Sequence, residues 1–412
     1  MDTTSSSGQQ PEPNTQDVNS CAQSQSAAVI FTTFLRLGLT SFGGPIAHLG
    51  YFRQAFVEQK RWLSESQFAQ LLAISQFLPG PASSQVGFGI GLVKGGWLGA
   101  LAAFTAFTAP SVLLLILFAT MLPLFGNEIG GAFLHGLKLV ALVVVAHGLR
   151  GMLAGLCPDP IRKSIAVGAA VLVLLADTAF AQLAVVAVGA VLGGYLCRDV
   201  KPTTDSGFVL GYSAKLGWVL VSLFLLLLFL LPFIPTVNDS VLNVFQHFYQ
   251  SGALVFGGGH VVLPLLEEAV VSPGWVTESE FLAGYGAAQA VPGPMFSFAA
   301  YLGQLQGGFG IAITALLAIF IPGFLLLGGM LPIWHQLARG PKAARAVAGV
   351  NAAVVGLLGA ALYDPIFTTA ITSSVDVCIA IVGLLLITTW NASALWIVAW
   401  CVVASLLATA VF

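Results

Sequence analysis

Long apolar runs separated by short polar loops follow one another along almost the whole chain. Crossing a bilayer takes roughly 17 to 25 predominantly apolar residues in a helix. Runs of that length lie near 100–124, 132–150, 180–197, 216–235, 311–333, 343–362, 366–388 and 391–411, and a shorter one lies at 163–176. The pattern predicts an all-α polytopic membrane protein.

Other apolar pieces are too short to cross, and they come in pairs. The pieces 66–78 and 82–93 flank Pro79-Gly80-Pro81, and 279–291 and 295–305 flank Pro292-Gly293-Pro294. At 1.5 Å per residue each piece reaches only about 20 Å, against a hydrocarbon core of about 30 Å. The pairs are therefore predicted to be re-entrant half-helices, broken at Pro-Gly-Pro. The segments 27–43 and 243–256, which end in glycines, are similarly short and predict a second hairpin in each half.

These breaks belong to an internal repeat with a near-constant offset. The Pro-Gly-Pro motifs are 213 residues apart, Ser41-Phe-Gly-Gly-Pro45 matches Val255-Phe-Gly-Gly-Gly259 at about 214, and Pro110 matches Pro322 at 212. Such an offset over about 100 residues indicates two homologous halves rather than chance similarity. The second half has Gly259 where the first has Pro45, which makes functionally unequal halves an open alternative.

Basic residues indicate that the halves are inverted in the membrane, because Lys and Arg favour cytoplasmic loops. The loop after the first glycine motif carries Arg53, Lys60 and Arg61, whereas its counterpart carries Glu267 and Glu268. The next equivalent loops reverse this bias, so equivalent loops lie on opposite sides. The predicted organisation is a disordered tail (1–26), a first repeat (27–197), a cytoplasmic linker with an unpaired transmembrane helix (198–241), and a second, inverted repeat (242–412).

Composition agrees with this class and narrows the chemistry. The chain is 57% hydrophobic and 8% charged, whereas roughly a quarter of the residues of a soluble domain are charged. No Walker A motif is present, and neither HExxH nor GxSxG occurs, so the sequence does not indicate an ATPase or an enzyme. The scattered cysteines have no metal-ligand spacing, and the sequence indicates no metal, no cofactor and no nucleic-acid partner.

The Pro-Gly-Pro breaks are the first candidate substrate site. A broken helix is tolerated in a membrane only where protein or a water-filled cavity meets its exposed backbone groups. Pro81 and Pro294 are each predicted to start a half-helix, whose free N–H groups suit an anion. The neighbouring candidates for substrate binding are Gln76, Gly80, Ser83, Ser84, Gln85, Gln289, Gly293 and Ser297, and Pro45, Pro79, Pro81, Pro292 and Pro294 are the structural breaks. A packing kink without a ligand is the alternative.

The glycine motifs and the charges inside apolar segments add further candidates. Backbone donors can come from Gly43, Gly44, Gly257 and Gly258, although close helix packing explains them equally well. Arg36 and Lys138 lie inside apolar runs, where a charge costs about 2.5–3.5 kcal/mol and is normally paired or functional. Snorkelling to an interface is the alternative for both. The repeat places Asn351 opposite Lys138. His48 and His260 are candidates for proton coupling, and a polar interfacial histidine is the alternative for both.

The leading motifs of both halves resemble the chromate ion transporter family in its long-chain, two-domain form. The resemblance is carried by Phe42-Gly-Gly-Pro45, by Trp62 with Leu63-Ser-Glu-Ser-Gln-Phe68, and by Gln76-Phe-Leu-Pro79-Gly80-Pro81, which recur as Phe256-Gly-Gly-Gly-His260, Trp275 and Pro292-Gly293-Pro294. It covers nearly the whole chain after residue 27. The resemblance implies a multi-pass protein of the inner (plasma) membrane that exports chromate and confers chromate resistance.

The sequence thus predicts a secondary active chromate transporter, with chromate bound near the midplane between the half-helix ends. Transport of sulfate or another tetrahedral oxyanion remains an alternative, because its geometry and charge barely differ. An anion channel and a membrane-embedded enzyme are weaker alternatives, and the sequence leaves a homodimer open.

Overall fold

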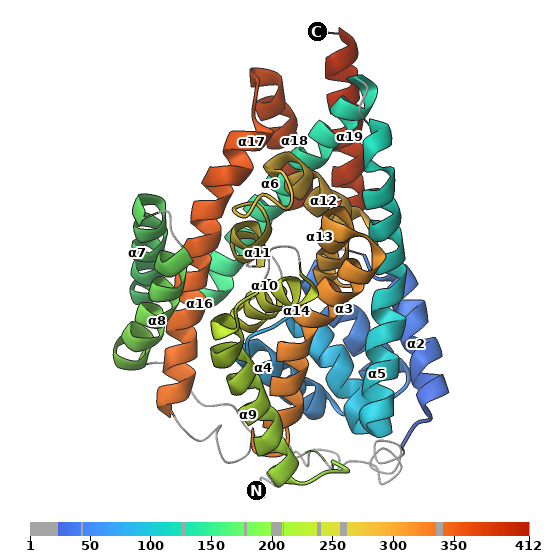
Figure 1. Cartoon of the computed structure of the whole chain (residues 1–412), viewed down its shortest axis with the longest axis vertical. Coiled ribbons are helices and arrows are strands. Elements are labelled where there is room, and N and C mark those ends of the chain that lie inside the picture. The colour runs from blue at the N-terminus through green and yellow to red at the C-terminus, as the bar shows by residue number, and fades with distance from the viewer. Residues whose placement is uncertain are drawn as a thin grey trace, which may run out of the picture.

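The computed structural model describes residues 24–42, 44–125, 128–176, 179–198, 208, 210–236, 240–255, 262–334 and 341–411. Helices dominate these residues, and no strand occurs among them. Five helical stretches of the described chain are long and apolar enough to cross a membrane: Ala82–Leu124, Ile129–Leu156, Ala214–Phe233, Phe309–Met330 and Ala344–Ala370. The prediction of an all-α polytopic membrane protein is confirmed. Figure 1 shows an elongated bundle.

The first half contains α2 (Ala27–Thr40), α3 (Gly44–Arg53), η1 (Gln54–Gln59), α4 (Glu65–Phe77), α5 (Ala82–Met121), η2 (Leu122–Phe125), α6 (Glu128–Leu156), α7 (Pro160–Ala176) and α8 (Ala179–Leu196). A single helix, α9 (Ala214–Leu230), extended by η3 (Leu231–Phe233), connects it to the second half.

The second half repeats the early part of this order. It contains α10 (Val241–Ala253), α11 (Val262–Val270), α12 (Glu278–Ala290), η5 (Met295–Ser297), α13 (Phe298–Gly307), α14 (Phe309–Met330), α16 (Pro341–Ala361), η6 (Leu362–Phe367), α17 (Thr368–Ala370), α18 (Ser374–Thr389) and α19 (Ala394–Val411).

The two short helices before the Pro-Gly-Pro motifs begin in the same way. A capping box closes the N-terminus of α4 through Ser64 and Gln67, and another closes that of α12 through Thr277 and Glu280. Both helices are 13 residues long and end where their Pro-Gly-Pro motif begins. In Figure 1, α4 lies in the lower half of the bundle and α12 in the upper half.

A glycine breaks the helix that follows each Pro-Gly-Pro motif. The path of α5 turns at Gly95 and Gly96, and Gly96 has φ 62°, which is far from helical. At the equivalent position Gly308 has φ 80° and separates α13 from α14. Positive φ values of this kind are accessible to glycine at little cost. The predicted short piece 82–93 is therefore the first part of α5, ahead of its kink.

Glycines also allow the same close helix crossing in both halves. The helix α2 packs against α5, and α10 packs against α14. A Cβ atom on Gly38 would lie 2.7 Å from the carbonyl oxygen of Phe107, and one on Gly252 would lie 2.1 Å from that of Ile319. Both distances are too short for a side chain, so these crossings require glycine.

One predicted span is wrong. The apolar run 366–388 was expected to form a single helix, but α17 ends at Ala370 and α18 begins at Ser374. The Asp376 carboxylate accepts hydrogen bonds from the backbone N–H groups of Thr372 and Ser373, at 3.0 and 2.8 Å. These bonds end one helix and start the next, which hydropathy does not reveal.

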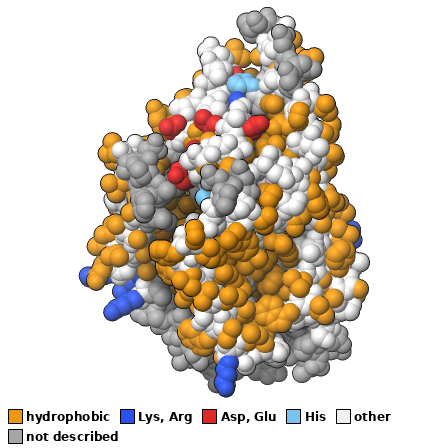
Figure 2. All heavy atoms as spheres, viewed as in Figure 1, with side chains coloured by type: hydrophobic (Ala, Val, Ile, Leu, Met, Phe, Trp, Pro, Cys, Tyr) orange, Lys and Arg blue, Asp and Glu red, His pale blue; other side chains and the backbone are white. Residues whose placement is uncertain are grey.

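Charged side chains are distributed unevenly along the bundle. In Figure 2 hydrophobic side chains cover most of the visible surface, Asp and Glu side chains lie in its upper part, and Lys and Arg side chains occur mainly near the lower end and the flanks. The apolar surface suits contact with lipid tails, since membrane-spanning helices expose hydrophobic side chains to the bilayer.

Candidate functional site

Three points at which a helix is interrupted meet at one small cavity in the protein. Its lining residues come from the start of α3 (Pro45), the start of α5 (Pro81, Ala82, Ser83 and Ser84) and the start of η5 (Pro294, Met295 and Phe296). Both Pro-Gly-Pro motifs and the first glycine motif therefore contribute to it, although they are far apart in the sequence. This cavity is called the central cavity below.

Proline sets the local geometry on both sides of the central cavity. Pro81 has φ −72° and ψ 94° and precedes α5, and Pro294 has φ −69° and ψ 134° and precedes η5. Neither helix start has a side-chain cap. The first N–H groups of a helix lack an intrahelical acceptor and carry a partial positive charge. Two positively polarised helix starts thus face one cavity, which suits an anion.

Two crossed hydrogen bonds tie the halves together beside this cavity. The N–H of Gly80 donates to the carbonyl of Val255 at 2.7 Å, and the N–H of Gly293 donates to the carbonyl of Ser41 at 3.0 Å. Gly80 and Gly293 are repeat partners, and so are Ser41 and Val255. The Pro-Gly-Pro break of each half is therefore held by the residue that precedes the glycine motif of the other half. In this conformation both N–H groups are engaged within the protein.

Each break also rests on a long helix of the opposite half. A Cβ atom on Gly80 would lie 3.0 Å from Cα of Gly323, and one on Gly293 would lie 2.9 Å from Oγ of Ser111. Gly80 has φ +120° and Gly293 has φ +103°, values that strain any other residue. Glycine is required at both positions by backbone conformation and by space.

Three of the predicted side-chain donors at the breaks, Gln85, Gln289 and Ser297, are bound to the protein itself. The Gln85 amide nitrogen donates to the carbonyls of Pro79 and Gly323 at 2.9 and 3.1 Å. Ser297 Oγ donates to the carbonyl of Pro294 at 2.6 Å, and Gln289 Nε2 lies 3.0 Å from Sδ of Met295. These residues hold the breaks in place.

Ser84 differs from those residues because its hydroxyl is not bound within the protein. The residue lines the central cavity, and its hydroxyl is buried with no hydrogen-bond partner among the described residues. Ser83 also lines the cavity. Gln76 is exposed, in contrast to its repeat partner Gln289, which is buried.

His48 lies beside one of the crossed hydrogen bonds. Its side chain is fully buried, and its Nε2 lies 3.2 Å from the carbonyl of Ser41, which already accepts from Gly293. A carbonyl only accepts, so Nε2 carries the hydrogen and Nδ1 is left without a partner among the described residues. The edge of the ring packs on Phe107, with ring centroids 5.3 Å apart.

Several other buried polar atoms around these residues also lack a partner within the described chain. They are Ser41 Oγ, Gln85 Oε1 and Thr108 Oγ1. An unsatisfied buried polar group costs about 1–3 kcal/mol, so such groups normally bind water or a ligand. These three atoms are available to hydrogen-bond water or a ligand.

The central cavity is closed in this conformation. The space open to the centre of a water-sized sphere is ≈ 10 Å³, which is about enough for one water molecule. A tetrahedral oxyanion is larger than water and does not fit. Binding there requires the helix starts to separate.

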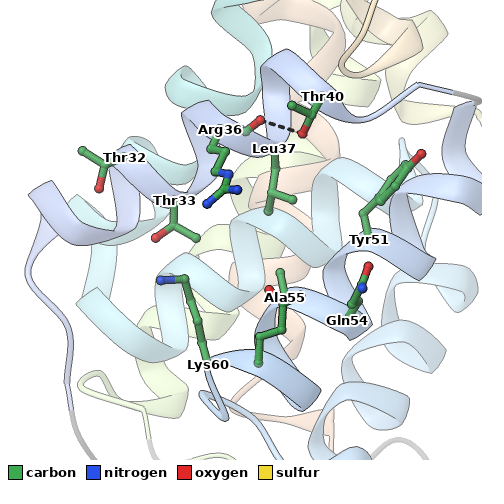
Figure 3. A pocket seen from close by; sticks show the side chains of 10 residues that line it. Thr32, Thr33, Arg36, Leu37, Thr40, Tyr51, Gln54, Ala55 and Lys60 are labelled. Atoms are coloured by element: carbon green, nitrogen blue, oxygen red, sulfur yellow. Dashed lines mark hydrogen bonds between the residues drawn. The ribbon is translucent and has the colours of Figure 1, made fainter.

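The two predicted membrane cations lie away from the central cavity. Arg36 is exposed on α2 and lines a different pocket together with Lys60, as Figure 3 shows. Lys138 is partly buried on α6, and its electrostatic partner is Glu278 at the start of α12. Asn351, on α16, is also partly buried, and its Oδ1 has no partner among the described residues. None of the three lines the central cavity.

Some predicted site residues lie outside the described part of the chain, and two residues of the central cavity were not predicted from the sequence. Gly43, Gly257, Gly258 and His260 lie outside the described residues, whereas Gly44 begins α3 with φ +76°. Met295 and Phe296 line the cavity, although the sequence offered no signal for them beyond their position after Pro294.

A family model described as "Chromate transporter" matches residues 28–195 and 242–406. These ranges cover most of the chain, including all the described residues of the central cavity. The chain belongs to the chromate transporter family.

Individual relatives agree with this assignment. A "Probable chromate transport protein" of Synechococcus elongatus is 30% identical over 80% of this chain and 82% of its own. A "Chromate transport protein" of Pseudomonas aeruginosa is 27% identical over 83% of this chain and 81% of its own, and one of Cupriavidus metallidurans is 26% identical over 85% and 84%. No solved structure matches the chain. The central cavity is therefore a site in a multi-pass membrane protein of the chromate transporter family.

Proposed function

We propose that this protein is a secondary active transporter that exports chromate across the inner membrane and so confers chromate resistance. The observation that carries the proposal is the central cavity, where helix starts from both halves meet and are tied by the crossed Gly80–Val255 and Gly293–Ser41 hydrogen bonds. The two hydrogen bonds are formed by equivalent residues of the two repeats. A site between two repeats of this kind is typical of transporters that open to alternate sides of the membrane.

Inverted halves are part of this proposal. Its support is the position of α4 and α12 in opposite halves of the bundle, together with the opposite charge of their preceding loops. The concentration of Lys and Arg near the lower end of Figure 2 favours a cytoplasmic location for that end.

The substrate would bind between the helix starts once the central cavity opens. The first N–H groups of α5 and the hydroxyls of Ser83 and Ser84 are the proposed donors, since an oxyanion carries acceptors on every face. A helix start contributes about 0.3–1 kcal/mol to anion binding, and about 2 kcal/mol when partly buried. Dipoles of this size do not offset the desolvation of a dianion, so a positive charge is needed as well.

His48 is the proposed source of that charge. Among the described residues neither a Lys or Arg nor His48 itself lines the closed central cavity, but Nδ1 of the His48 imidazole is buried without a partner. Burial disfavours the charged imidazolium, so His48 is neutral in this closed conformation and its protonation would accompany opening of the cavity. A proton at Nδ1 would then place a positive charge beside the Ser41–Gly293 bond and couple proton uptake to anion binding. Lys138 and Asn351 stay candidates for the substrate path after opening.

The membrane potential can drive export without ATP. A dianion that leaves a cell with a negative interior gains roughly 4.6 kcal/mol per 100 mV, from about 2.3 kcal/mol per charge. We infer a transporter rather than an enzyme or a channel, because the matched relatives are named as transport proteins.

Chromate flux into inside-out vesicles, with imposed pH and voltage gradients, tests the proposal. We expect saturable uptake that responds to voltage and that vesicles without the protein lack. Stronger competition by sulfate than by unlabelled chromate would favour a sulfate transporter, and non-saturating flux would favour a channel.

A further inference from the structure

A second polar pocket lies on the surface, between α2 and η1, and shares no residue with the central cavity. Its volume is ≈ 390 Å³, far larger than the central cavity. Arg36, Thr33, Lys60, Tyr51, Gln54 and Gln59 are among its lining residues, and most of them are labelled in Figure 3. This pocket is called the outer pocket below.

Two cations point into the outer pocket. Figure 3 shows the guanidinium of Arg36 and the ammonium of Lys60 directed toward the same space beside Thr33. Neither has a carboxylate partner among the described residues. Lys60 lies over the ring of Trp62, with its ammonium 5.5 Å from the ring centroid, a contact that positions the charge without neutralising it.

The neighbouring carboxylates are already paired with another residue. Arg53 donates to Glu58 at 2.6 Å and to Glu65 at 2.8 Å. One guanidinium and two carboxylates leave this group with one net negative charge beside the outer pocket. Together with Arg36 and Lys60, which have no carboxylate partner among the described residues, these five side chains carry one net positive charge.

Half of the remaining polar side chains of the outer pocket are free to bind a ligand. Within the described chain no side-chain hydrogen bond involves Tyr51, Gln54 or Gln59. In contrast, the hydroxyls of Thr32, Thr33 and Thr40 all donate to backbone carbonyls of α2, so their hydrogens are not available. A ligand that only accepts hydrogen bonds and carries negative charge fits this set, and a tetrahedral oxyanion is such a ligand.

The outer pocket is built on the two helices that lead to the central cavity. Arg36 lies on α2 five residues before Ser41, which is about 7.5 Å along a helix axis. Ser41 accepts one crossed hydrogen bond, and the cavity-lining Pro45 is the second residue of α3, which η1 extends. An anion held in the outer pocket is thus close to the path inward.

We propose that the outer pocket is a cytoplasmic-side docking site for the transported oxyanion, which binds between Arg36 and Lys60 before it enters the central cavity. The inference rests on the proposed function. The same chemistry would also accept the phosphate of an anionic lipid headgroup, so the test separates the two sources.

Transport kinetics in inside-out vesicles of purely zwitterionic lipid provide the test. We expect Arg36→Gln and Lys60→Gln each to raise KM for chromate roughly threefold and the double variant to raise it about tenfold, with kcat within about twofold. At 1 M salt, where the Debye length is about 3 Å, these differences should shrink below about twofold. Arg36→Lys should recover most of the loss. Lys215→Gln, an exposed cation at the start of α9 outside the pocket, is the matched control and should leave KM unchanged.

Three results would overturn the docking site: an unchanged KM in the double variant, a loss of kcat alone, or an effect that occurs only when anionic lipid is added. Equilibrium dialysis of the purified protein with radiolabelled chromate measures anion affinity without transport. A wild-type protein that transports no chromate would refute the proposed function. In that case weaker chromate binding by the double variant would still support the outer pocket, and equal binding would refute it.

Discussion

Replacing Gly80 with alanine should disable the protein, because three features of the structure oppose any side chain there. At φ +120° a non-glycine residue is strained by about 1–3 kcal/mol. The new Cβ would lie 3.0 Å from Cα of Gly323, a backbone atom that moves only with its helix. A shift of the break would weaken the Gly80–Val255 hydrogen bond, which contributes about 0.5–1.5 kcal/mol.

These effects together destabilise the closed conformation by about 2–4 kcal/mol. The population of the closed conformation relative to open conformations should then fall roughly 30- to 700-fold. Chromate uptake into vesicles should fall at least tenfold, and the melting temperature of the purified protein should drop. Because the repeat partner is held in the same way, Gly293→Ala should behave alike.

Gly168→Ala is the matched control. Gly168 lies in α7 with no neighbouring atom within 4 Å of an added Cβ, so alanine there should be neutral or stabilise the helix by up to about 1 kcal/mol. Normal uptake and an unchanged melting temperature in Gly80→Ala would refute the assigned role of the crossed hydrogen bonds.

Further substitutions test other parts of the site. Ser84→Ala should raise KM severalfold without loss of thermal stability, since it removes a buried hydroxyl that has no partner within the described chain; equal kinetics would exclude Ser84 from binding. Ser297→Ala should instead lower the melting temperature, because that hydroxyl bonds Pro294. Lys138→Ala should abolish chromate resistance while membrane insertion persists, and a double variant with Glu278→Gln should not restore it; restored resistance would make the pair purely structural. Asp376→Asn should cost about 2–4 kcal/mol of stability in a melting experiment, because the buried carboxylate accepts from His135 and caps α18; an unchanged melting temperature would contradict this.

Much of the helical arrangement could be predicted from hydropathy and motif spacing. The short helices before each Pro-Gly-Pro motif follow from apolar runs bounded by capping residues and proline, and the turn at Gly96 follows from a glycine pair. The run 366–388 was predicted as one helix because the small and β-branched residues on both sides of the α18 N-cap are apolar in a hydropathy profile. Ser373 and Asp376, spaced as a capping box, were the available signal.

The site was harder to predict, because hydropathy gives the depth of a residue but not the direction of its side chain. The breaks and Ser84 were expected together, and the structure brings them to one cavity. Arg36 was assigned to the same site, yet α2 turns it toward η1 and Lys60. The sequence also could not predict that the side-chain amide of Gln85 donates within the protein, since its acceptor at Gly323 is 238 residues away.

The crossed hydrogen bonds have a consequence for biogenesis. The N–H of Gly80 emerges from the ribosome long before its acceptor at Val255. We therefore expect that neither half matures alone. A polypeptide divided within residues 199–207 should need co-synthesis of both fragments, and an orphan fragment would be a natural target for membrane quality control.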